Sequence, residues 1–180
     1  MLWLLPFALA HMLAVDPASP SSTPNVVALP TPQVLLAADN RRVRSTSPRM
    51  VALIAEGVKR SPTFAKLVIA LHSTNVIVYV EPTFALPPDL AGRLLFSTIA
   101  GGQRYLRIQV RATVQGDQLI SLIGHELRHA MEVADDASVT DEGALAKLYR
   151  RIGDGIGGVH TYDTEAARVT GRAIRNELVG

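Results

Sequence analysis

The stretch GDQLISLIGHELRHAMEVA, residues 116–134, carries the strongest structural signal in this chain of 180 residues. Its apolar residues recur every three to four positions, which predicts an amphipathic helix. His125 and His129 are four positions apart and therefore share one side of that helix. Two imidazoles so placed can bind one metal ion, and Glu126 lies close enough to accept a proton from a water on that ion.

The two histidines are expected opposite the apolar stripe of this helix. With His125 at zero on a helical wheel, the apolar side chains fall between about 60° and 240°. Gln118, Ser121, His129 and Glu132 fall within about 40° of zero. A helix packed through its apolar stripe would therefore present both imidazoles to whatever lies across the groove.

The composition restricts the kinds of site and partner that this chain can have. Its 48% hydrophobic content fits one globular domain, and a formal net charge of +2 is too small to indicate a nucleic-acid partner. The sequence has no cysteine, so any metal must be held by His and carboxylate side chains. It also lacks a Gly-x-Ser-x-Gly motif, and the glycine-rich residues 153–158 lack the Lys-Ser/Thr of a phosphate-binding loop.

Residues 1–14 form an apolar run that is too short to span a bilayer comfortably, so no stable membrane span is expected. The run is typical of the hydrophobic part of a secretory signal, although no Lys or Arg precedes it and His11 interrupts it. An apolar N-terminal helix and a misassigned start are the alternatives. We expect residues 1–15 to be a signal peptide or an apolar segment. The protein is then exported to the periplasm or the cell exterior, or is cytoplasmic if this segment is not a signal.

Residues 16–48 contain six prolines among Ser and Thr, which predicts a linker and places the folded domain at residues 49–180. Within the domain, residues 50–59 have helical spacing, and Ser61-Pro62 is a typical start of a second helix. Residues 76–80 are β-branched and aromatic, which predicts a buried strand that Pro82 ends.

Residues 93–99 and 104–111 flank Ala100-Gly101-Gly102-Gln103, which is a hairpin signal. The second arm alternates apolar and polar residues, so one of its sides faces the core and the other faces water. Helices are expected over 144–152 and 162–178, the last with Thr161, Asp163 or Thr164 as its N-cap. The expected fold class is α+β, with a small antiparallel or mixed sheet of about three strands packed against the helices.

A catalytic zinc site uses three protein ligands and a water, so a third ligand is expected beside His125 and His129. Glu132 shares their side of the helix but lies about 10 Å along its axis from His125. It is better suited to orient His129 or Arg128, or to be solvated. His160 is most simply an exposed loop residue. Glu165 stands in the first turn of the last helix beside small residues that allow close packing, and it is the expected third ligand.

The motif His125-Glu126-x-x-His129 with a glutamate on a following helix resembles the gluzincin branch of the zincin metallopeptidases. The resemblance implies zinc as the metal and His125, His129 and Glu165 as its ligands. It also implies that Glu126 is the general base. An antiparallel edge strand precedes the active-site helix in that family, and the arm 104–111 has that place in the order.

Residues 124–133 and 162–167 also resemble small uncharacterised bacterial proteins with the same helix pair. The chain departs from the larger gluzincins at Val169, where an Asp often follows the third ligand by four positions. No second domain is evident to form the far wall of a cleft. The residues that could stabilise an oxyanion are Tyr162, His160 and Tyr149.

We therefore expect a zincin-like zinc peptidase that acts on a peptide or extended polypeptide. Glu126 would take a proton from the metal-activated water and return it to the leaving amine. One alternative is a catalytically inactive zincin-like domain that binds zinc or an interaction partner. The other is a metal-free helical protein whose two histidines are coincidental.

Overall fold

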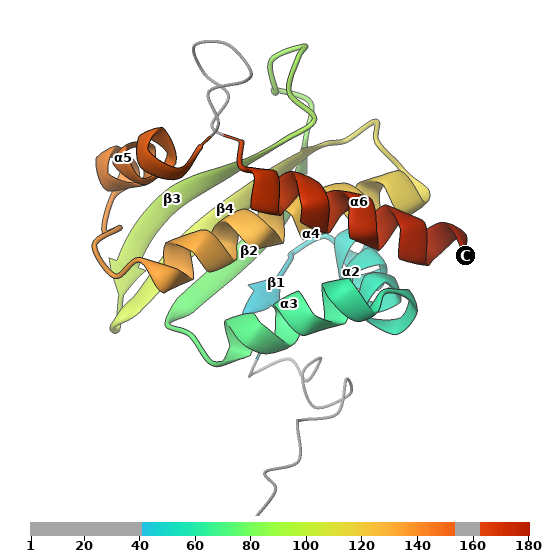
Figure 1. The fold of residues 1–180 in the computed structure, drawn as a ribbon, viewed down its shortest axis with the longest axis horizontal. Coiled ribbons are helices and arrows are strands. Elements are labelled where there is room, and N and C mark those ends of the chain that lie inside the picture. Colours follow the sequence, from blue (N-terminus) through green and yellow to red (C-terminus); the bar gives the residue numbers. More distant parts are fainter. Residues whose placement is uncertain (1–40, 154–162) are drawn as a thin grey trace, which may run out of the picture.

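The computed structural model describes residues 41–153 and 163–180 (Figure 1). The elements in chain order are β1 (Val43–Arg44), α2 (Pro48–Arg60), α3 (Pro62–His72), β2 (Val76–Thr83), β3 (Gly92–Ala100), β4 (Gln103–Arg111), α4 (Gly116–Asp135), α5 (Glu142–Ile152) and α6 (Glu165–Val179). The expected signal segment and residues 16–40 of the expected linker lie outside the described residues. Within the described part, no helix is long and apolar enough to cross a bilayer.

The strands form one mixed sheet in the order β1-β2-β4-β3. β1, β2 and β4 run parallel, and β3 runs antiparallel to β4 at an outer edge. The α+β class is confirmed, with four strands where about three were expected. β1 lies inside the expected linker, yet Val43 is buried and pairs with Val78, so the sheet begins before residue 49. Arginines on both sides of Val43 hide this two-residue strand from a hydrophobic pattern.

The expectation that Pro82 ends β2 is wrong, because the strand continues to Thr83. Val78 N–H donates to Arg42 O at 2.7 Å, so the nitrogens of alternate residues, Pro82 included, face the β1 side of the strand. β1 ends at Arg44. The missing N–H of Pro82 therefore removes no bond from the sheet.

The predicted hairpin is confirmed, because β3 and β4 pair antiparallel up to Ala100 and Gln103. Gly101 and Gly102 have φ of 56° and 72°, as the two central residues of a type I′ turn require. The core-facing residues of β4 are fully buried: Leu106, Ile108 and Val110.

α4 is the central helix of the fold, with the sheet on one side and α6 on the other (Figure 1). Gly124 allows α6 to come close, since a Cβ there would lie 2.1 Å from Ile174 Cδ1. The C-terminal end of α4 is held by Arg104 of β4, which is 5% exposed. Its guanidinium donates to the carbonyl oxygens of Val133 (2.8 Å) and Asp136 (2.7 Å). These contacts fix the helix that carries the two histidines.

Candidate metal centre

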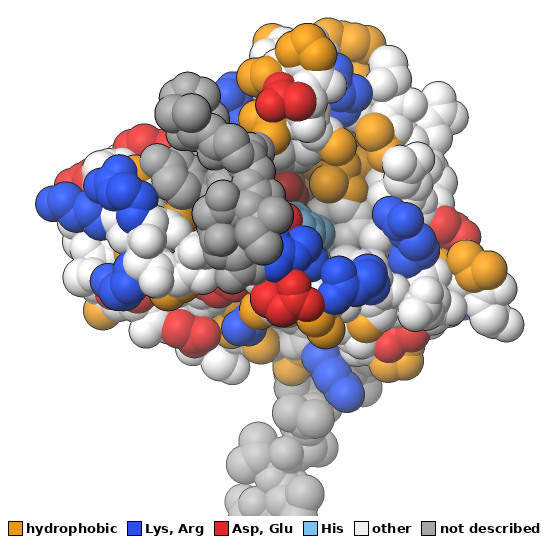
Figure 2. Space-filling model, turned by 45° about the horizontal axis from the view of Figure 1, so that its top comes forward, with side chains coloured by type: hydrophobic (Ala, Val, Ile, Leu, Met, Phe, Trp, Pro, Cys, Tyr) orange, Lys and Arg blue, Asp and Glu red, His pale blue; other side chains and the backbone are white. Residues whose placement is uncertain are grey.

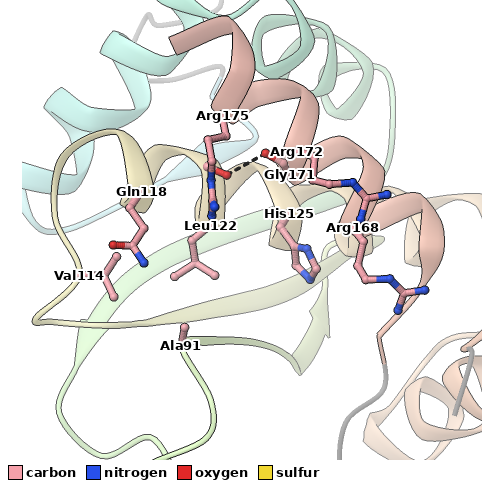
Figure 3. Close-up of a pocket in the computed structure, with 10 residues that line it drawn as sticks. Ala91, Val114, Gln118, Leu122, His125, Arg168, Gly171, Arg172 and Arg175 are labelled. Atoms are coloured by element: carbon pink, nitrogen blue, oxygen red, sulfur yellow. Dashed lines mark hydrogen bonds between the residues drawn. The ribbon is translucent and has the colours of Figure 1, made fainter. Parts of the chain in front are cut away.

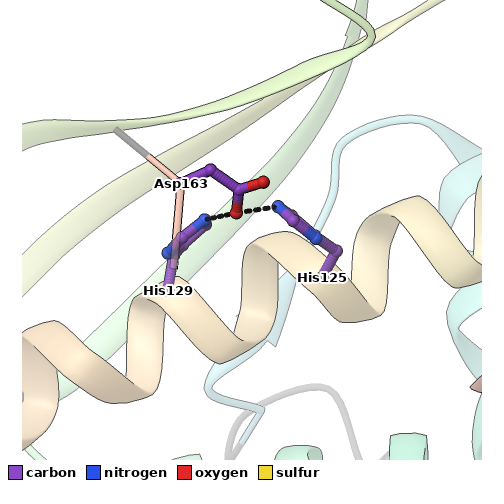
Figure 4. A group of neighbouring side chains, drawn as sticks. All are labelled: His125, His129 and Asp163. Atoms are coloured by element: carbon purple, nitrogen blue, oxygen red, sulfur yellow. Dashed lines mark ion pairs between the residues drawn. The ribbon is translucent and has the colours of Figure 1, made fainter. Parts of the chain in front are cut away.

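The two histidines of α4 direct their Nε2 atoms toward one carboxylate, that of Asp163 (Figure 4). Asp163 Oδ1 lies 3.4 Å from His125 Nε2 and 3.7 Å from His129 Nε2. One ligand atom from each of the three residues lies within 4.8 Å of the others. A tetrahedral zinc site with bonds of about 2.0–2.1 Å requires ligand atoms about 3.3–3.4 Å apart. Small side-chain movements would therefore bring all three to one zinc ion, and the donor set fits that metal.

Asp163 reaches this position from just before the N-cap of α6. The N-cap is Thr164, whose hydroxyl accepts a hydrogen bond from Ala167 N–H at 3.1 Å. The same hydroxyl donates to Oε1 of Glu132 on α4 at 2.7 Å, which ties the start of α6 to α4. Asp163 Oδ2 also lies 3.5 Å from Arg168 Nη1 on α6. The contact between the two helices thus places Asp163 beside the His pair.

Of the alternatives expected for Glu132, the structure shows the contact with His129. Glu132 Oε2 lies 2.8 Å from His129 Nδ1, and both side chains are buried. A carboxylate at this place holds a proton on Nδ1 and leaves Nε2 available to a metal. Glu132 therefore links the orientation of His129 to the position of Asp163, through Thr164.

His125, His129 and Asp163 line a groove of about 680 Å³. One wall is the edge strand β3 with the segment before it, and the other is formed by α4, α5 and Asp163. Figure 2 shows an imidazole surface in a hollow, with positively charged side chains on one rim and hydrophobic side chains on another. His129 and Glu132 are both buried, so His125 is the more open of the two histidines.

Glu126 also faces the groove, although it is only 4% exposed. Gly92 on β3 leaves room for its carboxylate, because a Cβ at that position would lie 2.7 Å from Glu126 Oε1. Burial raises the pKa of Glu126 to about 7. A carboxyl group in this state can both accept and donate a proton near neutral pH.

The charges of the cluster shift the two histidines in opposite directions. Burial, and then the neighbouring His129, lower the pKa of His125 to about 4. Burial also disfavours the charged form of His129, but the carboxylates of Asp163 and Glu132 outweigh it and raise the pKa to about 9. Burial acts against the ionised form of Asp163, yet the two histidines together hold its pKa below the usual range. The centre therefore favours a positive charge at the His129 end.

Glu165, the expected third ligand, does not join this group. Its side chain is 59% exposed and pairs with Arg168 (2.8 Å) and Arg172 (2.9 Å) on α6. The expected helix start at residue 162 is also early, because α6 begins at Glu165. This later start leaves Asp163 outside the first turn, free to turn toward α4. We therefore correct the third member of the candidate ligand set from Glu165 to Asp163.

One feature of the sequence indicates that Asp163 lies outside the last helix. Threonine is a strong N-cap residue, and with Thr164 as the cap the preceding side chain belongs to the loop and not to the helix. Two of the expected oxyanion residues, His160 and Tyr162, lie outside the described residues. The third, Tyr149, lines the groove and donates from its hydroxyl to His129 O at 3.3 Å. Its ring packs edge-on against the His129 ring, with centroids 5.1 Å apart.

Comparisons of this chain with protein-family models, with curated proteins and with solved structures find no match.

Proposed function

We propose that this protein is a zinc-dependent hydrolase that cleaves polypeptides. The observation that carries the proposal is the convergence of His125, His129 and Asp163 on one point of a groove that Glu126 also faces. His and carboxylate ligands in a set of three, with a fourth position left for water, are typical of catalytic zinc. The neighbouring glutamate has the place that a general base occupies in such sites.

Each residue of the centre has a defined task in this reaction. His125, His129 and Asp163 would hold the zinc, which when bound would supply a Lewis acid and lower the pKa of a water to about 7. Glu126 takes the proton from the attacking water and returns it to the leaving amine. Glu132 keeps His129 in the orientation that directs Nε2 into the groove.

The edge strand β3 supports a polypeptide as the substrate. Arg111 N–H donates to Ala91 O at 2.7 Å, and the antiparallel register continues from there. Alternate residues bond β4, so Gly92 and Leu94 direct their own N–H and C=O groups toward the open edge. Both residues line the groove. An extended peptide can therefore add to the sheet as a further strand beside α4.

Glu142 on α5 limits how far this pairing can extend. Its carboxylate accepts a hydrogen bond from Phe96 N–H at 2.8 Å and so occupies the next outward-facing position of β3. The backbone available to a substrate is therefore short and lies directly opposite the metal centre. On the side of the scissile bond that pairs with β3, the substrate would therefore be bound through only a few residues.

The test is a comparison of wild-type protein, Glu126→Gln and Glu81→Gln after loading with zinc, on a broad peptide library. Glu81 lies on β2, where it pairs with Arg107 and lines neither the groove nor the centre. We expect Glu126→Gln to retain zinc and to lose at least about 100-fold in cleavage rate, with Glu81→Gln unchanged. Equal cleavage by Glu126→Gln and wild type would overturn the assignment of the base. Zinc binding without any cleavage by wild type would indicate an inactive zinc-binding domain instead.

A further inference from the structure

A second cavity, of about 290 Å³, adjoins the groove on the opposite side of His125 (Figure 3). The two cavities share three lining residues: Ala91, Leu122 and His125. His125, a candidate metal ligand, therefore stands where the two cavities meet. A substrate bound in the groove could extend past the metal centre into this second cavity.

The second cavity is lined by three arginines of α6: Arg168, Arg172 and Arg175. They are four and three positions apart, so they share one side of the helix. None of the ten lining residues is Asp or Glu. The opposite wall is neutral, with Val114, Gln118 and Leu122. Figure 3 shows the arginine side chains of α6 gathered around the space beside His125.

The acidic neighbours of these arginines lie at one end of the row. Arg168 pairs with Asp163 and Glu165, and Arg172 pairs with Glu165 at 2.9 Å. Glu165 is mostly exposed and stands on the solvent side of the helix start. Arg175 lies farthest from Glu165 and pairs with no acidic side chain among the described residues. The positive charge of the row is therefore only partly balanced.

We propose that this second cavity binds a carboxylate group of the substrate, so that the enzyme prefers acidic polypeptides on the Arg172–Arg175 side of the metal centre. The guanidinium fork matches a carboxylate in shape and can bind it through two hydrogen bonds. The volume is too small for a second folded partner and suits one side chain or a chain end. The bound carboxylate is either the C-terminal carboxylate of the substrate or that of an Asp or Glu side chain, and the peptides below distinguish the two.

The proposal rests on the proposed function for its substrate class, but its test does not require turnover. Full-length protein freed of metal with EDTA is titrated with three short N-acetylated alanine peptides. The first ends in a free carboxylate, the second is the same peptide amidated, and the third is amidated with one internal Glu. We expect at least one acidic peptide to bind about tenfold or more tightly than the neutral one, with a preference that weakens as salt is added.

The variants separate this cavity from general charge attraction. Arg172→Gln with Arg175→Gln should abolish the preference, while Arg168 is kept because it contacts Asp163. The matched control is the double variant Lys147→Gln with Arg150→Gln on α5, which also removes two positive charges. Both residues are exposed and line neither cavity. Retention of the preference by the α6 double variant would overturn the proposal, as would equal binding of all three peptides by wild type.

Glu165→Gln provides a gain of binding from the same surface. It removes the counter-charge of Arg168 and Arg172, so the acidic peptide should bind more tightly than it binds wild type, and weaker binding would contradict the proposal. A preference for acidic peptides without hydrolysis would leave this inference standing and refute the proposed function. Hydrolysis without the preference would do the reverse.

Discussion

Glu132 is the residue whose removal should damage the metal centre without removing a ligand. Its Oε2 lies 2.8 Å from His129 Nδ1, and its Oε1 accepts from Thr164 at 2.7 Å. Loss of a carboxylate that orients a metal-binding histidine typically lowers metal affinity by about 10–100-fold, or about 1.4–2.7 kcal/mol. We therefore expect Glu132→Ala to fall in this range. Glu132→Gln keeps an acceptor for His129 but loses the charge, so it should lose about tenfold or less.

The assay is competition for zinc with a chromophoric chelator at neutral pH. Circular dichroism and thermal melting in EDTA give the folded fraction of each variant, because Glu132 is buried and also supports the start of α6. Glu142→Ala serves as the control, since that side chain contacts Phe96 and no histidine. The reasoning is refuted if folded Glu132→Ala binds zinc more tightly than wild type. If the alanine variant fails to fold, tighter zinc binding by folded Glu132→Gln refutes it instead. It is also refuted if folded Glu132→Ala matches the wild-type affinity.

Three further predictions concern the framework of the fold and the groove. Arg104→Met removes the hydrogen-bond donors to the carbonyl oxygens at the C-terminal end of α4. It should lower the free energy of unfolding by about 3–5 kcal/mol, which would appear as a fall of about 10 °C in melting temperature. An unchanged melting temperature would contradict this role of Arg104. Burial raises the pKa of Glu177, but hydrogen bonds from Ser61 and Thr63 outweigh burial, and the net shift of the pKa is downward. Ionised Glu177 therefore stabilises the folded state fully above the ordinary glutamate pKa, and this stabilisation is lost as the pH falls below that value. Glu177→Gln should therefore be less stable than wild type by about 1–2 kcal/mol at neutral pH and equal to it in acid, as urea titrations at several pH values would measure. Gly92→Ala should displace the Glu126 side chain, because Glu126 Oε1 would lie 2.7 Å from the new Cβ. We expect peptide cleavage to fall strongly and the zinc affinity to stay the same. Cleavage at the wild-type rate by this variant would show that catalysis does not depend on the present position of Glu126.

The local patterns of the sequence predicted much of the framework. The turn at Gly101 and Gly102, the alternation of β4 and the helical spacing of α4 each depend on near neighbours, and the structure contains all three. The pairing of Glu132 with His129 also follows from a spacing of three residues within one helix.

The parts that the sequence did not predict depend on contacts between distant segments. Val43 is a strand residue only because β2 lies beside it. Asp163 reaches the histidines because Thr164 bonds Glu132, which is 32 residues earlier in the chain. Glu165 has the more usual residue type for a third ligand, but the helix start directs it away from α4 and toward Arg168 and Arg172. A helix boundary displaced by three residues was enough to exchange one carboxylate for the other.

The zinc affinity of Asp163→Ala and Glu165→Gln, measured beside wild type, tests the metal centre most directly. The geometry predicts one zinc ion per chain in wild type, a loss of more than about 100-fold in affinity for Asp163→Ala, and wild-type affinity for Glu165→Gln. Absence of zinc binding by wild type, or a loss confined to Glu165→Gln, would contradict the assignment of His125, His129 and Asp163 as the ligands.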